Sequence, residues 1–401
     1  MKKSKFKSKL NSLRATPPPK VKKSYYTFSK EYPAGNIPIK RRKHKKVKSD
    51  FVKYALYVCL FLFICGVSFF TVNLGLDFSY KEPVTTEKSD LPESESESLL
   101  NKDGVRALYM PSEHLGNSDY ISSFIKQIRK KNGNSVLIEF KTREGKLNFT
   151  SMEDYAIAGK CSVFDNDTVR KAIDLFENAD ITVIARVYCF EDSVIPTVKN
   201  ELAVKYMDTD VNWLDGSNED GGKPWLNPAI KRNHNYLVGI LKELYSLGVK
   251  GFILEACQFP DETDAAGATY PKENNFANKN TALKAFIEKA RNALPQDAFL
   301  LLGLSATDAA EGNEGIFHGS MTNTVCDGIA ADISERKAEY VIDKKTDFVS
   351  MLSLYSEISK ANNDKAFIPV ISTQDYTRSF LSAMKKAGYP NFIIYGENGE
   401  Y

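Results

Sequence analysis

Ionisable and amide side chains recur where short apolar segments end in the C-terminal part of the sequence. Two carboxyl groups placed about a glycosidic bond can hydrolyse it, at a separation of about 5–5.5 Å for retention or about 6.5–9.5 Å for inversion. The candidate carboxylates for such a pair are Glu255 and Asp332, with Asp327 as a rival of Asp332. The acid needs a pKa raised by burial to hold its proton near neutral pH.

The remaining candidates would bind the substrate. Aromatic rings offer flat apolar faces to the C–H faces of a sugar, between its hydroxyl groups. The predicted substrate-binding residues lie at the same segment ends and in the loops after them, and they are Glu139, Lys141, Arg186, Tyr188, Trp225, Gln258 and Asp375. A structural alternative stays open, in which Glu255 forms an internal ion pair with Arg186 or Lys141.

No cofactor and no metal is expected. Four cysteines, Cys161, Cys189, Cys257 and Cys326, are too widely spaced for a zinc motif. Cys189 and Cys257 lie in apolar runs, which favours small buried thiols. The sequence has no constellation of His and Asp typical of a catalytic metal site, which argues against metal-dependent deacetylation.

Apolar runs and amphipathic segments alternate from Gly104 onward, as in a parallel sheet covered by helices. The predicted strands are Val105–Met110, Ser135–Lys141, Thr182–Phe190, Gly251–Phe259, Ala298–Ser305, Gly328–Ser334, Phe367–Ser372 and Phe392–Tyr395. The predicted helices are Asp119–Lys131, Thr168–Asn178, Ala229–Leu247, Thr281–Leu294, Asp347–Asn362 and Thr377–Lys386. Asn227-Pro228 should begin the third helix and Gly248 should end it.

Eight strands with intervening helices predict an α/β fold, a (β/α)8 TIM barrel over residues 103–401. A doubly wound open sheet is the alternative, but the first strand is not followed by a glycine-rich phosphate loop. In a barrel, the C-terminal strand ends and the loops after them form the active site. The candidate residues should therefore meet at one mouth.

Three segments in the middle of this region carry a family resemblance: Ile184–Phe190 with Glu201–Val204, then Lys223–Pro228, then Gly251–Pro260. In this order they resemble the glycoside hydrolase family of bacterial hydrolase-like TIM barrels, which is distantly similar to alpha-amylase-type barrels. The resemblance implies a glycoside hydrolase, with the fourth-strand carboxylate falling on Glu255. On that resemblance we expect Glu255 to act as nucleophile or base and Asp332 as the acid. Glu255 stands where an Asp is usual, Ile253 where amylase-type barrels have Arg, and Gln258 where the family motif has Arg. A catalytically inactive glycan-binding or cell-envelope scaffold barrel is therefore the alternative.

The N-terminal part has a different character. The chain has 401 residues and a formal net charge of +3, but residues 1–53 carry about +16 and the remainder about −13. Residues 54–76 contain no charged side chain and at about 1.5 Å per residue are long enough to span a bilayer as a helix. The basic cluster Lys40–Lys48 just before them predicts a cytoplasmic N-terminus and an extracellular C-terminal domain.

We therefore expect a disordered basic cytoplasmic tail (1–53), a transmembrane signal-anchor helix (54–76), a charged linker (77–102) and the barrel. The predicted partners are a polysaccharide or cell-wall glycan, the lipid bilayer through residues 54–76, and anionic lipid headgroups for the tail. Nucleic acid is not expected, because the large C-terminal part is acidic. The localisation would be the cell membrane, as a single-pass protein.

Overall fold

A computed structural model describes residues 98–260, 267–270, 276–305, 308–309, 317–319, 324–332, 360, 365–372, 382, 385–386, 388 and 390–395. The predicted tail, signal-anchor helix and most of the linker lie outside these residues, as do most of the predicted helices over 347–362 and 377–386. Among the helices described, none combines the length and apolar character that a membrane crossing requires.

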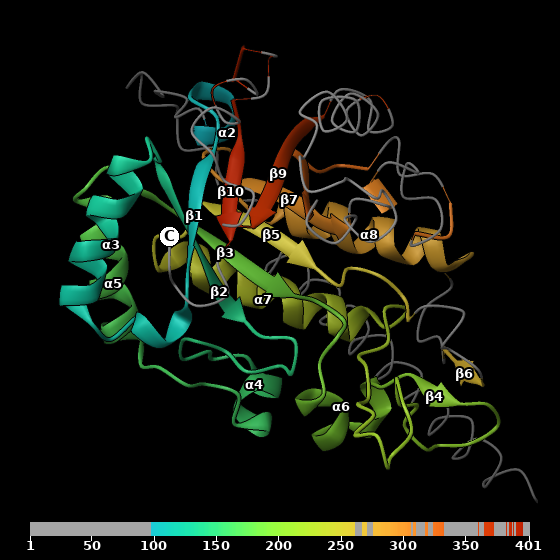
Figure 1. The fold of residues 1–401 in the computed structure, drawn as a ribbon. Coiled ribbons are helices and arrows are strands. Elements are labelled where there is room, and N and C mark those ends of the chain that lie inside the picture. The colour runs from blue at the N-terminus through green and yellow to red at the C-terminus, as the bar shows by residue number, and fades with distance from the viewer. Residues whose placement is uncertain are drawn as a thin grey trace, which may run out of the picture. The chain divides into compact units, whose positions relative to one another are not determined.

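Eight parallel strands close into a barrel, which confirms the predicted (β/α)8 architecture and excludes the open sheet (Figure 1). Around the barrel the order is β1, β10, β9, β8, β7, β5, β3 and β2, back to β1. Their bounds are β1 Arg106–Met110, β2 Ser135–Lys141, β3 Thr182–Tyr188, β5 Gly251–Glu255, β7 Phe299–Ser305, β8 Gly328–Asp332, β9 Ala366–Ser372 and β10 Phe392–Tyr395.

Within the described ranges, long helices follow β1, β2, β3 and β5, as the periodicity predicts. The four long ones are α3 Ser118–Lys130, α5 Asn166–Glu177, α7 Lys231–Ser246 and α8 Lys279–Asn292. The helix α7 starts at Lys231, after a turn in which the Asn227 side chain accepts the Ala229 N–H, and Gly248 ends it with φ of +107°. Shorter elements that the sequence did not indicate are η1 Ser112–His114, α4 Asp154–Gly159, α6 Val194–Val198, η2 Asn200–Leu202 and the antiparallel pair β4 Lys205–Tyr206 and β6 Ala268–Thr269.

Two separate hydrophobic layers support the barrel. The larger one lies between the strands and the helices, and the smaller one fills the barrel interior. The interior layer takes side chains from all eight strands: Ala107, Leu137, Ile184, Ile253, Leu301, Ala330, Ile368 and Ile393. The short helix α2 Leu99–Lys102 adds Leu99 and Leu100 to this layer. Because the interior is filled below, only the strand ends above it can form a cavity.

A β-bulge changes the direction of the last residue of β2. Glu139 is opposite Arg186, but Lys141 is opposite Val187, so two residues of β2 match one of β3. Lys141 consequently faces outward with Val187, which belongs to the layer under the helices. Its Nζ lies 2.8 Å from Asp192 Oδ2, and both side chains are fully buried. Lys141 therefore pairs with Asp192 and not with Glu255, and it is not among the residues that line the cavity at the barrel mouth.

Replacing one partner of this buried pair should destabilise the fold strongly. Lys141→Met leaves the Asp192 carboxylate buried without its cation, and we expect a loss of about 3–5 kcal/mol in the free energy of unfolding. Urea denaturation followed by circular dichroism measures it. The matched control is Lys223→Met, because Lys223 and Glu144 are both about half exposed and 3.5 Å apart. That change should cost less than about 1 kcal/mol. Equal losses in the two variants would contradict the assignment.

Candidate functional site

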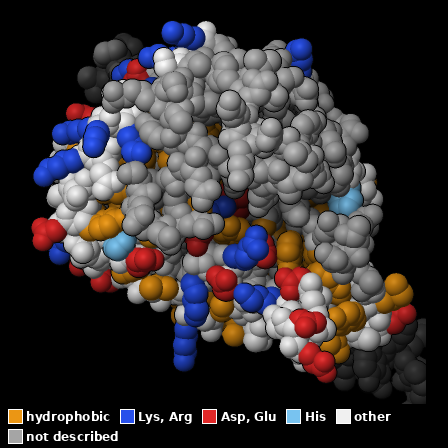
Figure 2. Space-filling view, viewed as in Figure 1, with side chains coloured by type: hydrophobic (Ala, Val, Ile, Leu, Met, Phe, Trp, Pro, Cys, Tyr) orange, Lys and Arg blue, Asp and Glu red, His pale blue; other side chains and the backbone are white. Residues whose placement is uncertain are grey.

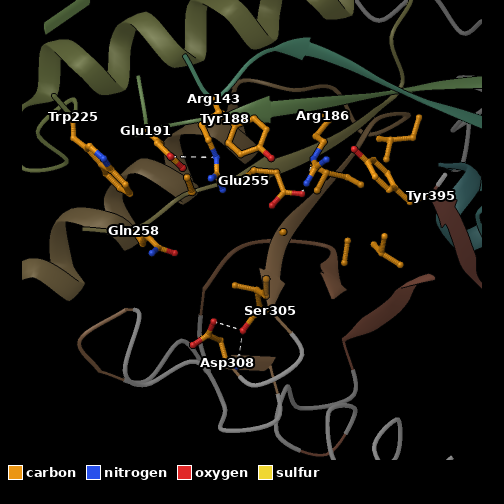
Figure 3. Close-up of a pocket in the computed structure, with 17 residues that line it drawn as sticks. Arg143, Arg186, Tyr188, Glu191, Trp225, Glu255, Gln258, Ser305, Asp308 and Tyr395 are labelled. Atoms are coloured by element: carbon orange, nitrogen blue, oxygen red, sulfur yellow. Dashed lines mark hydrogen bonds and ion pairs between the residues drawn. The ribbon is translucent and has the colours of Figure 1, made fainter. Parts of the chain in front are cut away.

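The mouth formed by the C-terminal strand ends contains a cavity of about 400 Å³. Five of the predicted site residues line it: Arg186, Tyr188, Trp225, Glu255 and Gln258. Figure 3 shows their side chains converging on one space from β3, β5 and the loops after them. The floor is apolar, because Leu137, Ile253, Ala330 and Val370 of the strands below also line the cavity.

An ion pair between Arg186 and Glu255 occupies the centre of the mouth. Arg186 Nε donates to Glu255 Oε1 at 3.0 Å, with about a fifth of each side chain exposed. The guanidinium carbon also lies 5.2 Å from the ring centre of Tyr188 and 5.6 Å from that of Tyr395. Burial would lower the pKa of Arg186, but Glu255, Tyr188 and Glu139 together raise it. The pair therefore places the Glu255 carboxyl group and its cationic partner side by side at the cavity.

The neighbouring backbone leaves space for Glu255. A methyl group on Gly303, in the adjacent strand β7, would lie 2.5 Å from the Glu255 carboxyl carbon. The residue after Glu255, Ala256, has φ of +46°, a left-handed conformation that a non-glycine residue adopts at some cost. This turn ends β5 directly after the carboxylate. Glu255 is thereby fixed at the strand end, beside a glycine that lets it point into the cavity.

A second ion pair lines the same cavity. Arg143, in the loop after β2, lies with Nε 3.2 Å from Glu191 Oε1, in the loop after β3. Burial raises the pKa of Glu191, Arg143 and Lys223 lower it, and Asp215 and Glu144 raise it further; the net shift is upward. The Arg143 guanidinium carbon lies 5.6 Å from the ring centre of Tyr188, whose own pKa rises to about 12, first of all through burial. Tyr188 is therefore flanked by both arginines.

The other predicted carboxylates have different surroundings. Glu139 is the register neighbour of Arg186, and burial is the main reason that its pKa is raised. Asp332 is the last residue of β8, in register with Ser305 and Val370, which both line the cavity; its side chain and Asp375 lie outside the described part of the chain. The rival Asp327 precedes β8 at the opposite end of the barrel and pairs with Arg291 at 2.9 Å. Asp327 therefore has a structural contact away from the mouth.

The loop after β7 adds a carboxylate that the strand itself lacks. Asp308 lines the cavity, accepts a hydrogen bond from the Ser305 hydroxyl, and donates its own N–H to Ser305 Oγ at 3.1 Å. The sequence prediction stopped at the strand end and missed it. Arg143 and Tyr395 were missed as well, and a signal existed for both, because each lies at or just after a predicted strand end.

Charge around the site is mixed in sign. On the face shown in Figure 2, acidic and basic side chains are interspersed over the lower half of the described surface. The described cysteines are free thiols, and Cys189 and Cys257 are buried as predicted. Within the described ranges, no group of three His, Cys, Asp or Glu residues is arranged to hold a metal ion. The arrangement offers carboxylates, their arginine partners and aromatic rings.

Several solved structures are similar to this chain. One is a hypothetical protein from Ruminiclostridium thermocellum, at 23% identity over 49% of this chain and 96% of that one, with a TM-score of 0.42. Another is an exo-β-N-acetylglucosaminidase from Vibrio harveyi in complex with N-acetylglucosamine, at 10% identity over 66% of this chain and 41% of that one, with a TM-score of 0.43. A third is a trehalose-6-phosphate hydrolase from Bacillus licheniformis, at 13% identity over 72% and 64%, with a TM-score of 0.43.

This chain spans less than two thirds of the length of either named hydrolase, and all three TM-scores are below 0.5, so no chemistry is transferred from them. A comparison with curated protein sequences finds no match. The sequence pattern of one family does match, over residues 107–306, and this range contains seven of the predicted site residues, Glu255 among them. Residues 107–306 of this chain thus belong to the family described as "Putative glycosyl hydrolase domain".

Proposed function

We propose that the barrel hydrolyses glycosidic bonds of an extracellular or cell-wall polysaccharide, with Glu255 as nucleophile or base. The observation that carries the proposal is the placement of Glu255: a carboxylate paired with Arg186 at 3.0 Å, lining a cavity of about 400 Å³. An adjacent cation favours the ionised form of a carboxylate, which is the form that both roles require. The family match adds the reaction class.

Glycoside hydrolysis also needs a proton donor. Glu191 lines the same cavity, and burial raises its pKa, which is the direction of shift that a proton donor requires. Asp332 remains a second candidate for this role, because its backbone lies between two cavity-lining residues. The substrate-binding roles proposed for Tyr188, Trp225 and Gln258 rest on their positions in the cavity wall. Asp308 is available for a sugar hydroxyl.

Binding without hydrolysis is the alternative function. Its specific support is that Glu255 and Glu191 each pair with an arginine. A carboxylate engaged in an ion pair is less free to attack a substrate, and the nearby cation disfavours the protonated form that a proton donor needs. Saturable glycan binding by the wild type, with no reducing ends released from any glycan tested, would establish this alternative and remove the proposed hydrolysis.

Glu255→Gln should lower kcat by about 10²- to 10⁴-fold, which is the usual contribution of a positioned general acid or base. The Gln side chain keeps an oxygen that can accept the hydrogen bond from Arg186 Nε, so the variant should remain folded. Its circular dichroism spectrum should therefore match that of the wild type. Gly303→Ala should give a similar loss, because its methyl group would displace the Glu255 carboxylate. Release of reducing sugar from a polysaccharide panel is the measurement. Undiminished turnover in Glu255→Gln would remove Glu255 from the chemistry.

Arg143→Gln should move the alkaline limb of the pH profile of kcat/KM to higher pH. The Arg143 cation lowers the pKa of Glu191, so its removal raises that pKa and keeps the acid protonated at higher pH. The direction follows whether or not the variant also weakens substrate binding. The matched control is Glu191→Gln. This variant should lose most activity, and its remaining activity should show no alkaline limb in the pH profile of kcat/KM. An alkaline limb that stays in place would favour Asp332 as the proton donor.

We further propose that residues 54–76 anchor the protein in the cell membrane, with residues 1–53 in the cytoplasm and residues 103–401 outside. The support is the uncharged segment, long enough for a bilayer, and the basic cluster Lys40–Lys48 immediately before it. Anionic lipid headgroups would attract the basic tail, by about 1 kcal/mol for each lysine or arginine near the surface. This arrangement would bring the cavity to substrates outside the cell.

Protease added to intact cells should degrade the barrel and leave the N-terminal tail protected. Epitope tags at both ends of the full chain, detected after proteolysis, provide the measurement. Detergent-permeabilised cells are the control, in which both tags should be lost. Survival of the C-terminal tag on intact cells, with its loss after permeabilisation, would reverse the proposed orientation.

A further inference from the structure

The loop between α6 and α7, residues 203–226, is built as a self-supporting unit beside the cavity. It folds back on itself through antiparallel bridges that pair Ala203 with Leu226, Lys205 with Asn212, and Leu214 with Pro224. Lys205 is buried in this loop, and its Nζ donates to Asn212 Oδ1 at 3.0 Å and to the Asp210 carbonyl at 3.2 Å. The loop therefore has a defined conformation of its own.

The end of this loop is attached to the strand end that carries Glu191. The Leu226 N–H donates to the Phe190 carbonyl at 2.9 Å, and the Val204 N–H donates to the Trp225 carbonyl at 3.0 Å. The backbone of Trp225 is consequently fixed between the loop and the residue that precedes Glu191. Trp225 and Glu191 both line the cavity, as Figure 3 shows.

The indole ring of Trp225 has a separate restraint, the carboxylate of Asp215. Trp225 Nε1 donates to Asp215 Oδ2 at 3.1 Å, and the Lys223 N–H donates to Asp215 Oδ1 at 2.6 Å. The Asp215 N–H in turn donates to the Lys223 carbonyl at 3.0 Å. The Asp215 carboxylate thus binds both the Trp225 ring and the backbone of Lys223, and connects them to the opposite arm of the loop. The ring cannot rotate away without breaking the Nε1 contact.

We propose that Asp215 is a positioning residue that holds Trp225 as a stacking surface for a sugar ring at the Glu191 end of the cavity. This inference rests on the proposed function for the location of the ligand. A ring already fixed in its binding orientation loses little conformational freedom when a ligand arrives. The ligand class is a carbohydrate with an uncharged ring, because both cationic side chains known to line the cavity already pair with carboxylates.

The chain offers a direct optical test, because it contains two tryptophans. Both are buried in the same hydrophobic layer, Trp213 at 2% and Trp225 at 8% exposure, but only Trp225 of the two lines the cavity. A sugar ring stacked on Trp225 should therefore shift its fluorescence emission. The probes are cellotetraose, chitotetraose and maltotetraose, added separately to the full-length protein carrying Glu255→Gln so that none is consumed. At least one of them should produce a saturable shift that Trp225→Phe abolishes.

Asp215→Ala should weaken the dissociation constant of that probe about 2- to 10-fold, the cost of ordering one freed side chain. In Trp225→Phe the ring no longer donates to Asp215, so adding Asp215→Ala should weaken binding, measured by calorimetry, no further. The matched control is Asp220→Ala, which removes another exposed aspartate of the same loop that contacts Ser217 instead. It should bind as the parent does. A simple loss of loop structure would instead weaken binding equally in both alanine variants.

The outcomes separate this inference from the proposed hydrolysis. Probe binding that depends on Asp215, without turnover by the wild type, would support the stacking surface and reject the enzyme. Turnover by the wild type with unchanged binding in Asp215→Ala would reject the positioning role and leave the enzyme intact. An emission spectrum that no probe alters would overturn the inference.

Discussion

The ion pair between Arg186 and Glu255 is the interaction on which the mouth of the barrel depends. Charges removed from water are costly unless they are paired, so the two side chains must meet. Parallel pairing of β3 with β5 places Tyr188 opposite Glu255. Arg186 lies two residues before Tyr188 on the same strand, opposite Ile253. Tyr188 and Tyr395 then hold the guanidinium on its two sides. An acidic residue in an apolar strand thus has a cationic partner without losing its contact with the cavity.

A second pair of charges forms between the loops after β2 and β3, where Arg143 contacts Glu191. Tyr188 lies between the two arginines, so cations and rings alternate along this side of the mouth. The two glutamates nevertheless differ. Glu255 lies beside a cation whose charge is secured by its neighbours, whereas burial and the nearby Asp215 push Glu191 toward its protonated form. Two carboxyl groups with different surroundings in one cavity are the arrangement that acid–base hydrolysis of a glycoside uses.

The sequence predicted the strands and the centre of the site well, because continuous apolar runs mark strands that are covered on both faces. Glu255, Arg186 and Tyr188 followed from counting to the ends of those runs. The position of Lys141 was predicted wrongly, because a β-bulge shifts the in–out alternation of β2 by one residue. No residue type in β2 indicates that bulge. Arg143 and Asp308 lie beyond strand ends, where only the loop conformation decides which side chain returns to the cavity. Asp215 acts through Trp225, a contact across ten residues that periodicity does not encode.

Closure of the barrel has a consequence for how the protein is made. The strand β1 pairs with β10 near the other end of the chain, and the Val105 N–H bonds to the Asn391 side chain across 286 positions. The ring can close only after the ribosome has released the chain as far as β10. Until then the nascent sheet has an unpaired edge at β1, the kind of edge that recruits other chains. Arg186 and Glu255, on adjacent strands from the middle of the sequence, can meet before that edge is sealed.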